Sequence, residues 1–291
     1  MRILKNVLRP IYQRVNHLSG GSLGIMKDAF QRFNEARASQ AAAAMAYYAL
    51  FSLFPLLLAL VAAWSFVLER EQAFQQVVGF VTEAIPISQA LIEKNIQRVL
   101  ELRGAVGLVG LLGLLWSGMG AFEVLANNIN RAWPGAEPRS FLERRLVALG
   151  MVGVLSALLA FSLISTTVLN LLPQLQVPLW DSVSIYETPL WGALSNFIPW
   201  LFTFLLFLAL YLWVPNIEVE RRVAFWGALV AALAWEVAAN GLAWYLRSGL
   251  VRYELVYGSL GAVVALMLWI YWSSWIALFG AHLSAAIAQR S

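Results

Sequence analysis

Long apolar stretches separated by polar segments dominate the pattern of the chain. Six of them carry the roughly 20 mostly apolar residues that a helix needs to cross a hydrocarbon layer of about 30 Å. They are residues 41–68, 104–126, 146–172, 190–214, 222–246 and 258–286. The ten-residue alternating segments typical of membrane-spanning strands are not seen. The pattern therefore predicts an all-α fold with six transmembrane helices.

The composition supports insertion into a membrane. Hydrophobic residues make up 60% of the 291 residues and charged residues only 12%, against about 25% charged in ordinary soluble domains. The chain has no cysteine, and its two histidines are His17 and His282, which excludes thiolate and multi-histidine metal sites. We therefore expect an integral membrane protein that needs no cofactor.

The distribution of Lys and Arg predicts the orientation of the spans. Fourteen of them flank span ends on the side of the N-terminus and six flank the ends on the opposite side. Because cytoplasmic loops carry the excess of positive charge, both termini are expected in the cytoplasm. No apolar run precedes Gly20, so we expect no cleavable signal peptide.

The pattern divides the chain into a cytoplasmic or interfacial N-terminal segment, residues 1–39, and a transmembrane domain, residues 40–291. Residues 22–38 are predicted to form an amphipathic helix whose apolar face carries Leu23, Met26, Phe30 and Phe33. This helix would lie on the membrane surface or pack beneath the bundle, and the sequence favours neither. Residues 69–103 are predicted to form a long external loop with two short amphipathic helices.

Glu236 is the most informative polar residue, because it lies near the middle of the fifth span. A carboxylate there is costly and usually faces the bundle interior or a water-filled cavity. Asn240 follows one turn later on the same face. The functional hypothesis is a proton- or cation-sensitive site in a translocation path. The alternative is a structural carboxyl group that bonds to a neighbouring helix.

Other polar residues of the spans are weaker candidates for lining a translocation path. Glu123 and Asn127 lie toward the cytoplasmic end of the second span, where a structural role is favoured. The third span carries a polar stripe that would line an aqueous groove or bond back to its own helix. Its members are Ser162, Thr166 and Asn170. His282 lies near the inner end of the sixth span, where a hydrogen-bonded interfacial histidine is favoured over a titrating one.

Four arginines of one cytoplasmic loop set the topology and are candidates for contact with anionic lipid head groups. They are Arg131, Arg139, Arg144 and Arg145.

Two glycines of the second span, Gly118 and Gly120, allow either close helix packing or a break in the helix. Close packing is favoured.

Several segments together resemble the YihY/BrkB family of bacterial inner-membrane proteins, whose older label was ribonuclease BN. They are residues 42–55 (AAAMAYYALFSLFP), 115–122 (LWSGMGAF), 130–133 (NRAW), 213–216 (WVPN), 234–236 (AWE), 257–262 (YGSLGA) and 280–283 (GAHL). The family usually has Glu where this chain has His282, so a carboxylate role there is not carried over. The resemblance implies a six-helix protein of the inner membrane, of a family proposed to transport lipids or ions and associated with virulence.

These expectations favour a transporter that moves lipid, or an anionic or protonatable solute, through a cavity between helices. The alternative is a non-transporting scaffold for envelope assembly. We expect no enzymatic activity: the two aspartates, Asp28 and Asp181, and the two histidines form no cluster of nuclease metal ligands. Membrane lipids are the expected partners and nucleic acid is not, since no aromatic and basic RNA platform is seen. The sequence is compatible with an oligomer.

Overall fold

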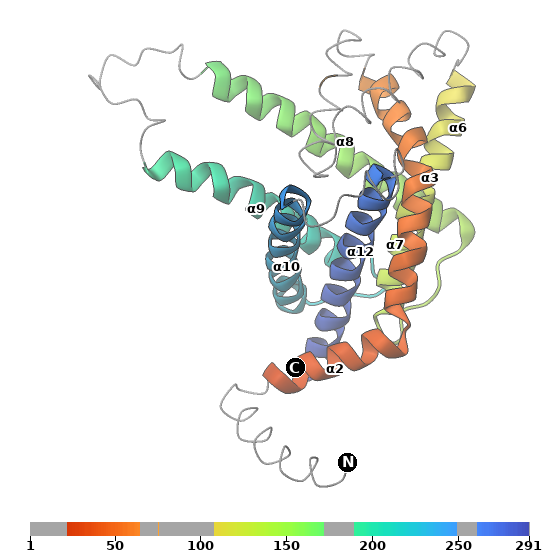
Figure 1. Ribbon diagram of the computed structural model, residues 1–291. Coiled ribbons are helices and arrows are strands. Elements are labelled where there is room, and N and C mark those ends of the chain that lie inside the picture. Colours follow the sequence, from red (N-terminus) through yellow and green to blue (C-terminus); the bar gives the residue numbers. More distant parts are fainter. Residues whose placement is uncertain (1–21, 65–74, 76–107, 172–188, 249–260, 291) are drawn as a thin grey trace.

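The computed structural model describes residues 22–64, 75, 108–171, 189–248 and 261–290. Every long element within these residues is an α-helix, and the described part contains no strand (Figure 1). The helices are α2 (Ser22–Glu35), α3 (Ala38–Trp64), α6 (Leu108–Gly118), α7 (Gly120–Arg131), α8 (Phe141–Leu171), α9 (Pro189–Trp213), α10 (Arg221–Arg247) and α12 (Gly261–Ala288). The all-α prediction is thereby confirmed.

The positions of the long helices follow the apolar stretches of the sequence. α3, α8, α9, α10 and α12 each coincide with a predicted span to within a few residues. Within the described residues, Arg221–Tyr245 and Val263–Ala288 are long and apolar enough to cross a membrane. Apart from Gln75, the predicted external loop at residues 69–103 lies outside the described residues.

α12 is the central helix of the described bundle. It packs against α10, α3, α2, α7 and α9, and most of its C-terminal half is buried. Small residues allow this close approach: a Cβ added at Gly280 would collide with the hydroxyl of Tyr211. That hydroxyl donates a 2.8 Å hydrogen bond to the carbonyl oxygen of Ala277, which satisfies a fully buried polar group.

The amphipathic helix near the N-terminus has two different apolar surfaces. α2 crosses the lower ends of α3 and α12 in Figure 1. Phe33 is fully buried there, with its ring centroid 4.6 Å from that of Trp275. Leu23, Met26 and Phe30 are exposed on another face of the same helix. One side of α2 therefore packs beneath the bundle, and only the other is open to a membrane surface.

The second predicted span consists of two helices that meet at Met119. α6 ends at Gly118 and α7 begins at Gly120, but the hydrogen bond from Glu123 N–H to the Met119 carbonyl oxygen continues the helical pattern. A Cβ at Gly118 would lie 3.0 Å from the Cα of Leu56, so the glycine lets α6 approach α3 closely. The expectation of close packing is met at this position, beside a local interruption of the helix.

Candidate functional site

Glu236 and Asn240 form a bonded pair on an exposed face of α10. The side-chain amide of Asn240 donates to the Oε1 atom of Glu236 at 2.9 Å and to the Glu236 carbonyl oxygen at 2.9 Å. Both residues are exposed. Their spacing of four residues places them on one side of α10, as expected.

The surroundings of this pair are apolar. Leu233, Val237 and Trp244 are exposed on the adjoining strip of the same helix, with Val237 73% exposed. The other side of α10 packs on α9 and α12. The carboxyl group of Glu236 therefore lies outside the tightly packed interior of the described bundle. It and Asn240 form a small polar patch beside an exposed apolar surface.

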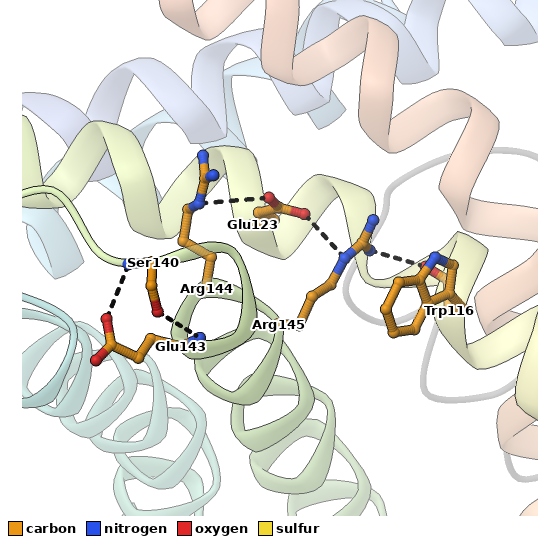
Figure 2. Close-up of polar contacts among 6 residues, drawn as sticks. All are labelled: Trp116, Glu123, Ser140, Glu143, Arg144 and Arg145. Carbon is orange, nitrogen blue, oxygen red and sulfur yellow. Dashed lines mark hydrogen bonds and ion pairs between the residues drawn. The ribbon is translucent and has the colours of Figure 1, made fainter.

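A second polar cluster joins α7 to the start of α8 (Figure 2). The Oε2 atom of Glu123 lies 3.4 Å from Nε of Arg145, and its Oε1 atom lies 3.9 Å from Nε of Arg144. The Glu123 side chain is 19% exposed, so this ion pair is partly screened from water. Two cations around one carboxylate leave the cluster with a net positive charge.

Arg145 is also held by an aromatic residue of α6. Its Nη1 atom donates to the Trp116 carbonyl oxygen at 3.1 Å. The guanidinium carbon lies 4.3 Å from the centroid of the Trp116 ring and 5.6 Å from that of the Phe141 ring. Such cation–π contacts stabilise a cation that is removed from water.

The start of α8 is fixed by a reciprocal cap. The backbone N–H of Ser140 donates to Oε2 of Glu143 at 2.8 Å, and the Glu143 N–H donates to Oγ of Ser140 at 3.4 Å (Figure 2). Hydrogen bonding from Ser140, chiefly from its backbone N–H, lowers the pKa of the exposed Glu143 carboxyl group. The cap aligns the first turn of α8, and so positions Arg144 and Arg145.

The other two arginines of this loop are placed differently. Arg139 is part-buried, and its guanidinium donates to the carbonyl oxygen of Val214 at 2.5 Å. Burial lowers the pKa of Arg139, and the nearby Glu143 opposes that effect. Arg131 is exposed at the end of α7. The four candidate arginines therefore do not gather into one site, and Arg144 and Arg145 are the two that share a partner.

The two acidic residues lie at different positions in their helices, with Glu123 in the first turn of α7. Glu123 follows Gly120 by one turn, and a Cβ at Gly120 would lie 3.4 Å from Oγ of Ser52, at the midpoint of α3. Glu236 lies just past the midpoint of α10.

The remaining candidates are not brought to either cluster. Asn127 is half-buried on α7, and Glu123 pairs with the arginines of α8 instead. His282 is 3% exposed, and its ring meets the ring of Phe33 edge-on at 5.8 Å. The three residues of the polar stripe lie within α8, and the structure describes their backbone but not their side chains. They are Ser162, Thr166 and Asn170.

The sequence reasoning missed the contacts of Glu123 although a signal was present. A carboxylate inside an apolar span usually pairs with a cation, and the Arg144–Arg145 pair follows it within one loop. The Ser-x-x-Glu spacing of residues 140–143 is also typical of a helix start. As regards metals, the described residues contain no group of three or more His, Cys, Asp or Glu able to hold an ion.

Comparison with known proteins identifies relatives of the chain. The family model described as "Virulence factor BrkB" matches residues 29–291. A UPF0761 membrane protein of Legionella pneumophila is 27% identical over 207 residues, which cover 70% of this chain and 47% of that protein. A UPF0761 membrane protein of Alkalilimnicola ehrlichii is 27% identical over 244 residues, covering 81% of this chain and 53% of that protein.

A third relative carries a different name. YfkH of Bacillus subtilis, whose name describes it as ribonuclease-like, is 24% identical over 216 residues, covering 74% of this chain and 78% of that protein. The chain spans about half the length of the Legionella and Alkalilimnicola relatives. No solved structure matches the chain.

Proposed function

The chain belongs to the virulence factor BrkB family of membrane proteins, and from this premise we propose that it moves lipid, or an anionic or protonatable solute, across the bacterial inner membrane. The proposal takes residues 40–291 as a domain of six transmembrane helices with both termini in the cytoplasm. Residues 1–39 are its cytoplasmic and interfacial segment. The proposal assigns no catalytic step to the chain.

The exposed Glu236–Asn240 pair near the middle of α10 is the observation that supports transport. A carboxylate at mid-membrane depth costs about 2.5–3.5 kcal/mol on insertion scales when it faces hydrocarbon. This cost is offset where water or a polar ligand reaches the group. An exposed position on α10 is open to both, whereas a purely structural carboxyl group would be expected among packed neighbours.

The apolar surface beside the pair favours lipid among the two substrate classes. A lipid has a polar head and apolar chains, and α10 offers a polar pair next to Val237 and Leu233. The head group would contact Glu236 and Asn240 while the chains stay on the apolar strip. Contact with that apolar strip would not stabilise the binding of a small hydrophilic solute.

The test is lipid movement in proteoliposomes. The full chain is reconstituted with lipids labelled at the head group, and the loss of label from the outer leaflet is followed at several pH values. Glu236→Gln is expected to slow movement about tenfold, as loss of about 1.4 kcal/mol of stabilisation would, and to flatten its pH dependence. Glu218→Gln, at an exposed site between α9 and α10, is the matched control. An unchanged rate and pH profile in Glu236→Gln would rule out this role.

A scaffold for envelope assembly is the second candidate. The exposed apolar residues of α10 and the exposed aromatic group Tyr47, Tyr48 and Phe51 on α3 also suit a partner helix in the membrane. This function predicts no lipid or solute movement in proteoliposomes. It also predicts stable co-purification of a partner, which deletion of residues 70–103 abolishes.

A further inference from the structure

We propose that Arg144 and Arg145 bind the phosphate of an anionic membrane lipid beside α8. This inference deepens the proposed function by naming the lipid class, and its place in a transport route rests on that function. The binding itself needs no transport, so the two can be tested separately. Its basis is the cluster of Figure 2 and the surface around it.

The charge of the cluster favours an anion. Two guanidinium groups face the single carboxylate of Glu123, and both of their Nε atoms are buried without a hydrogen bond. Glu143, the nearest other acid on α8, points toward Ser140 in Figure 2 and is held by the helix cap. One positive charge therefore remains for a ligand.

The donors are suited to phosphate. In Figure 2 the terminal nitrogens of Arg144 point away from Glu123, and the Arg144 side chain is 38% exposed. Trp116 and Glu123 hold Arg145 in place through Nη1 and Nε, so neither contact uses its Nη2 atom. Guanidinium groups bind phosphate oxygens through parallel N–H donors, so a fixed Arg145 pays little entropy on binding.

The surface next to the arginines is apolar and open. Leu142, Leu146 and Leu149 recur at helical spacing on α8 and are all exposed. Trp116 and Phe141 are exposed beside Arg145. A free phosphate ion would make no contact with this apolar surface, whereas the acyl chain of a phospholipid would cover it. The arginines and the apolar surface beside them together favour a lipid as the ligand.

The test is lipid binding to the purified full chain, measured by native mass spectrometry with phosphatidylglycerol and with phosphatidylcholine. The wild-type chain is expected to retain phosphatidylglycerol preferentially. Arg144→Gln is expected to weaken that binding about fivefold, the worth of one arginine near an anionic lipid, and to leave the Arg145–Trp116 contact in place. Arg144→Lys is expected to restore part of the preference. Arg221→Gln, an exposed arginine at the start of α10, is the control.

Glu123→Gln separates a binding site from a structural ion pair. Removing the competing carboxylate is expected to strengthen phosphatidylglycerol binding about fivefold while lowering the thermal stability of the chain. Unchanged lipid preference in both Arg144→Gln and Glu123→Gln, or competition by inorganic phosphate at the same concentration as the lipid, would overturn the inference. Retained binding without lipid movement in proteoliposomes would instead contradict only the proposed function.

Discussion

The side chain of Asn130 accepts a 2.6 Å hydrogen bond from the backbone N–H of Asn216, 86 positions further along the chain. Its amide group also donates to the carbonyl oxygen of Glu137 at 3.0 Å. One side chain thus ties the end of α7 to its own following loop and to the turn between α9 and α10. Asn130 is 5% exposed, so water has little access to replace these bonds.

Asn130→Ala is therefore expected to destabilise the fold by about 1–3 kcal/mol, because it leaves the Asn216 N–H without its acceptor and removes one of the two donors to the Glu137 carbonyl, the other being the Asn216 side-chain amide. The measurement is thermal unfolding of the purified chain in detergent. Asn128→Ala is the matched control, since the bond that Asn128 makes among the described residues is to the carbonyl of Val124 in its own helix. Equal losses in the two variants would contradict the tie between the segments.

Gly280→Ala is expected to destabilise the chain by about 1–3 kcal/mol through overpacking. The added Cβ would meet the Tyr211 hydroxyl and would lie 3.0 Å from the Cβ of Ala231. Gly241→Ala, in the exposed part of α10 with nothing within 4 Å of the new Cβ, is expected to stabilise it by about 0.5–1 kcal/mol. Thermal unfolding of the two variants checks the opposite signs, and the same sign in both would contradict the packing of α12.

The cap of α8 gives an expected pH dependence. The pKa of Glu143 is lowered in the folded chain, so its stabilising effect is full above the ordinary carboxyl value of about 4.3 and is lost as the pH falls through the lowered value. Glu143→Gln should therefore melt below wild type at pH 7, and the difference should shrink as the pH drops below 4. A difference that stays constant down to pH 3 would show that the charge has no part in the cap.

The turn between α2 and α3 offers a test of backbone strain. Arg37 has φ of 52°, in the left-handed region that favours glycine. Arg37→Gly is expected to raise stability by up to about 1 kcal/mol, because the side chain no longer opposes this conformation. Gly135→Ala, at a φ of 84°, should lower it. Chemical unfolding of both variants is the measurement, and a stabilising Gly135→Ala would refute the argument.

Helix positions could be predicted because the length of an apolar run is a local property. The start of α10 at Arg221 and the end of α12 at Ala288 lie within two residues of their predicted bounds. The sequence offered Arg144 and Arg145 as partners for Glu123, but the pairing itself depends on how the loop after α7 sets the start of α8 against α7, which no local pattern gives. The exposed orientation of Glu236 also depends on which side of α10 meets α9 and α12, and a helix with apolar residues all round leaves that side undefined.

The segments that begin at Glu123 (EVLANN, residues 123–128) and at Glu236 (EVAANG, residues 236–241) are similar in sequence, but the contacts of the two glutamates differ. Glu123 pairs with arginines of α8, whereas Glu236 pairs with Asn240 on its own helix. A repeated sequence pattern can thus serve two different polar environments. The packing of neighbouring helices, which decides the side-chain partners, makes the environments of Glu123 and Glu236 different.

The central place of α12 has a consequence for the biogenesis of the chain. The ribosome makes α12 after every other described helix, yet α12 contacts α2, α3, α7, α9 and α10. In the proposed six-helix topology, the helices inserted earlier therefore lack this neighbour until α12 has been made. A ribosome stalled before residue 261 would leave the earlier helices without their common neighbour, and so exposed to membrane quality control.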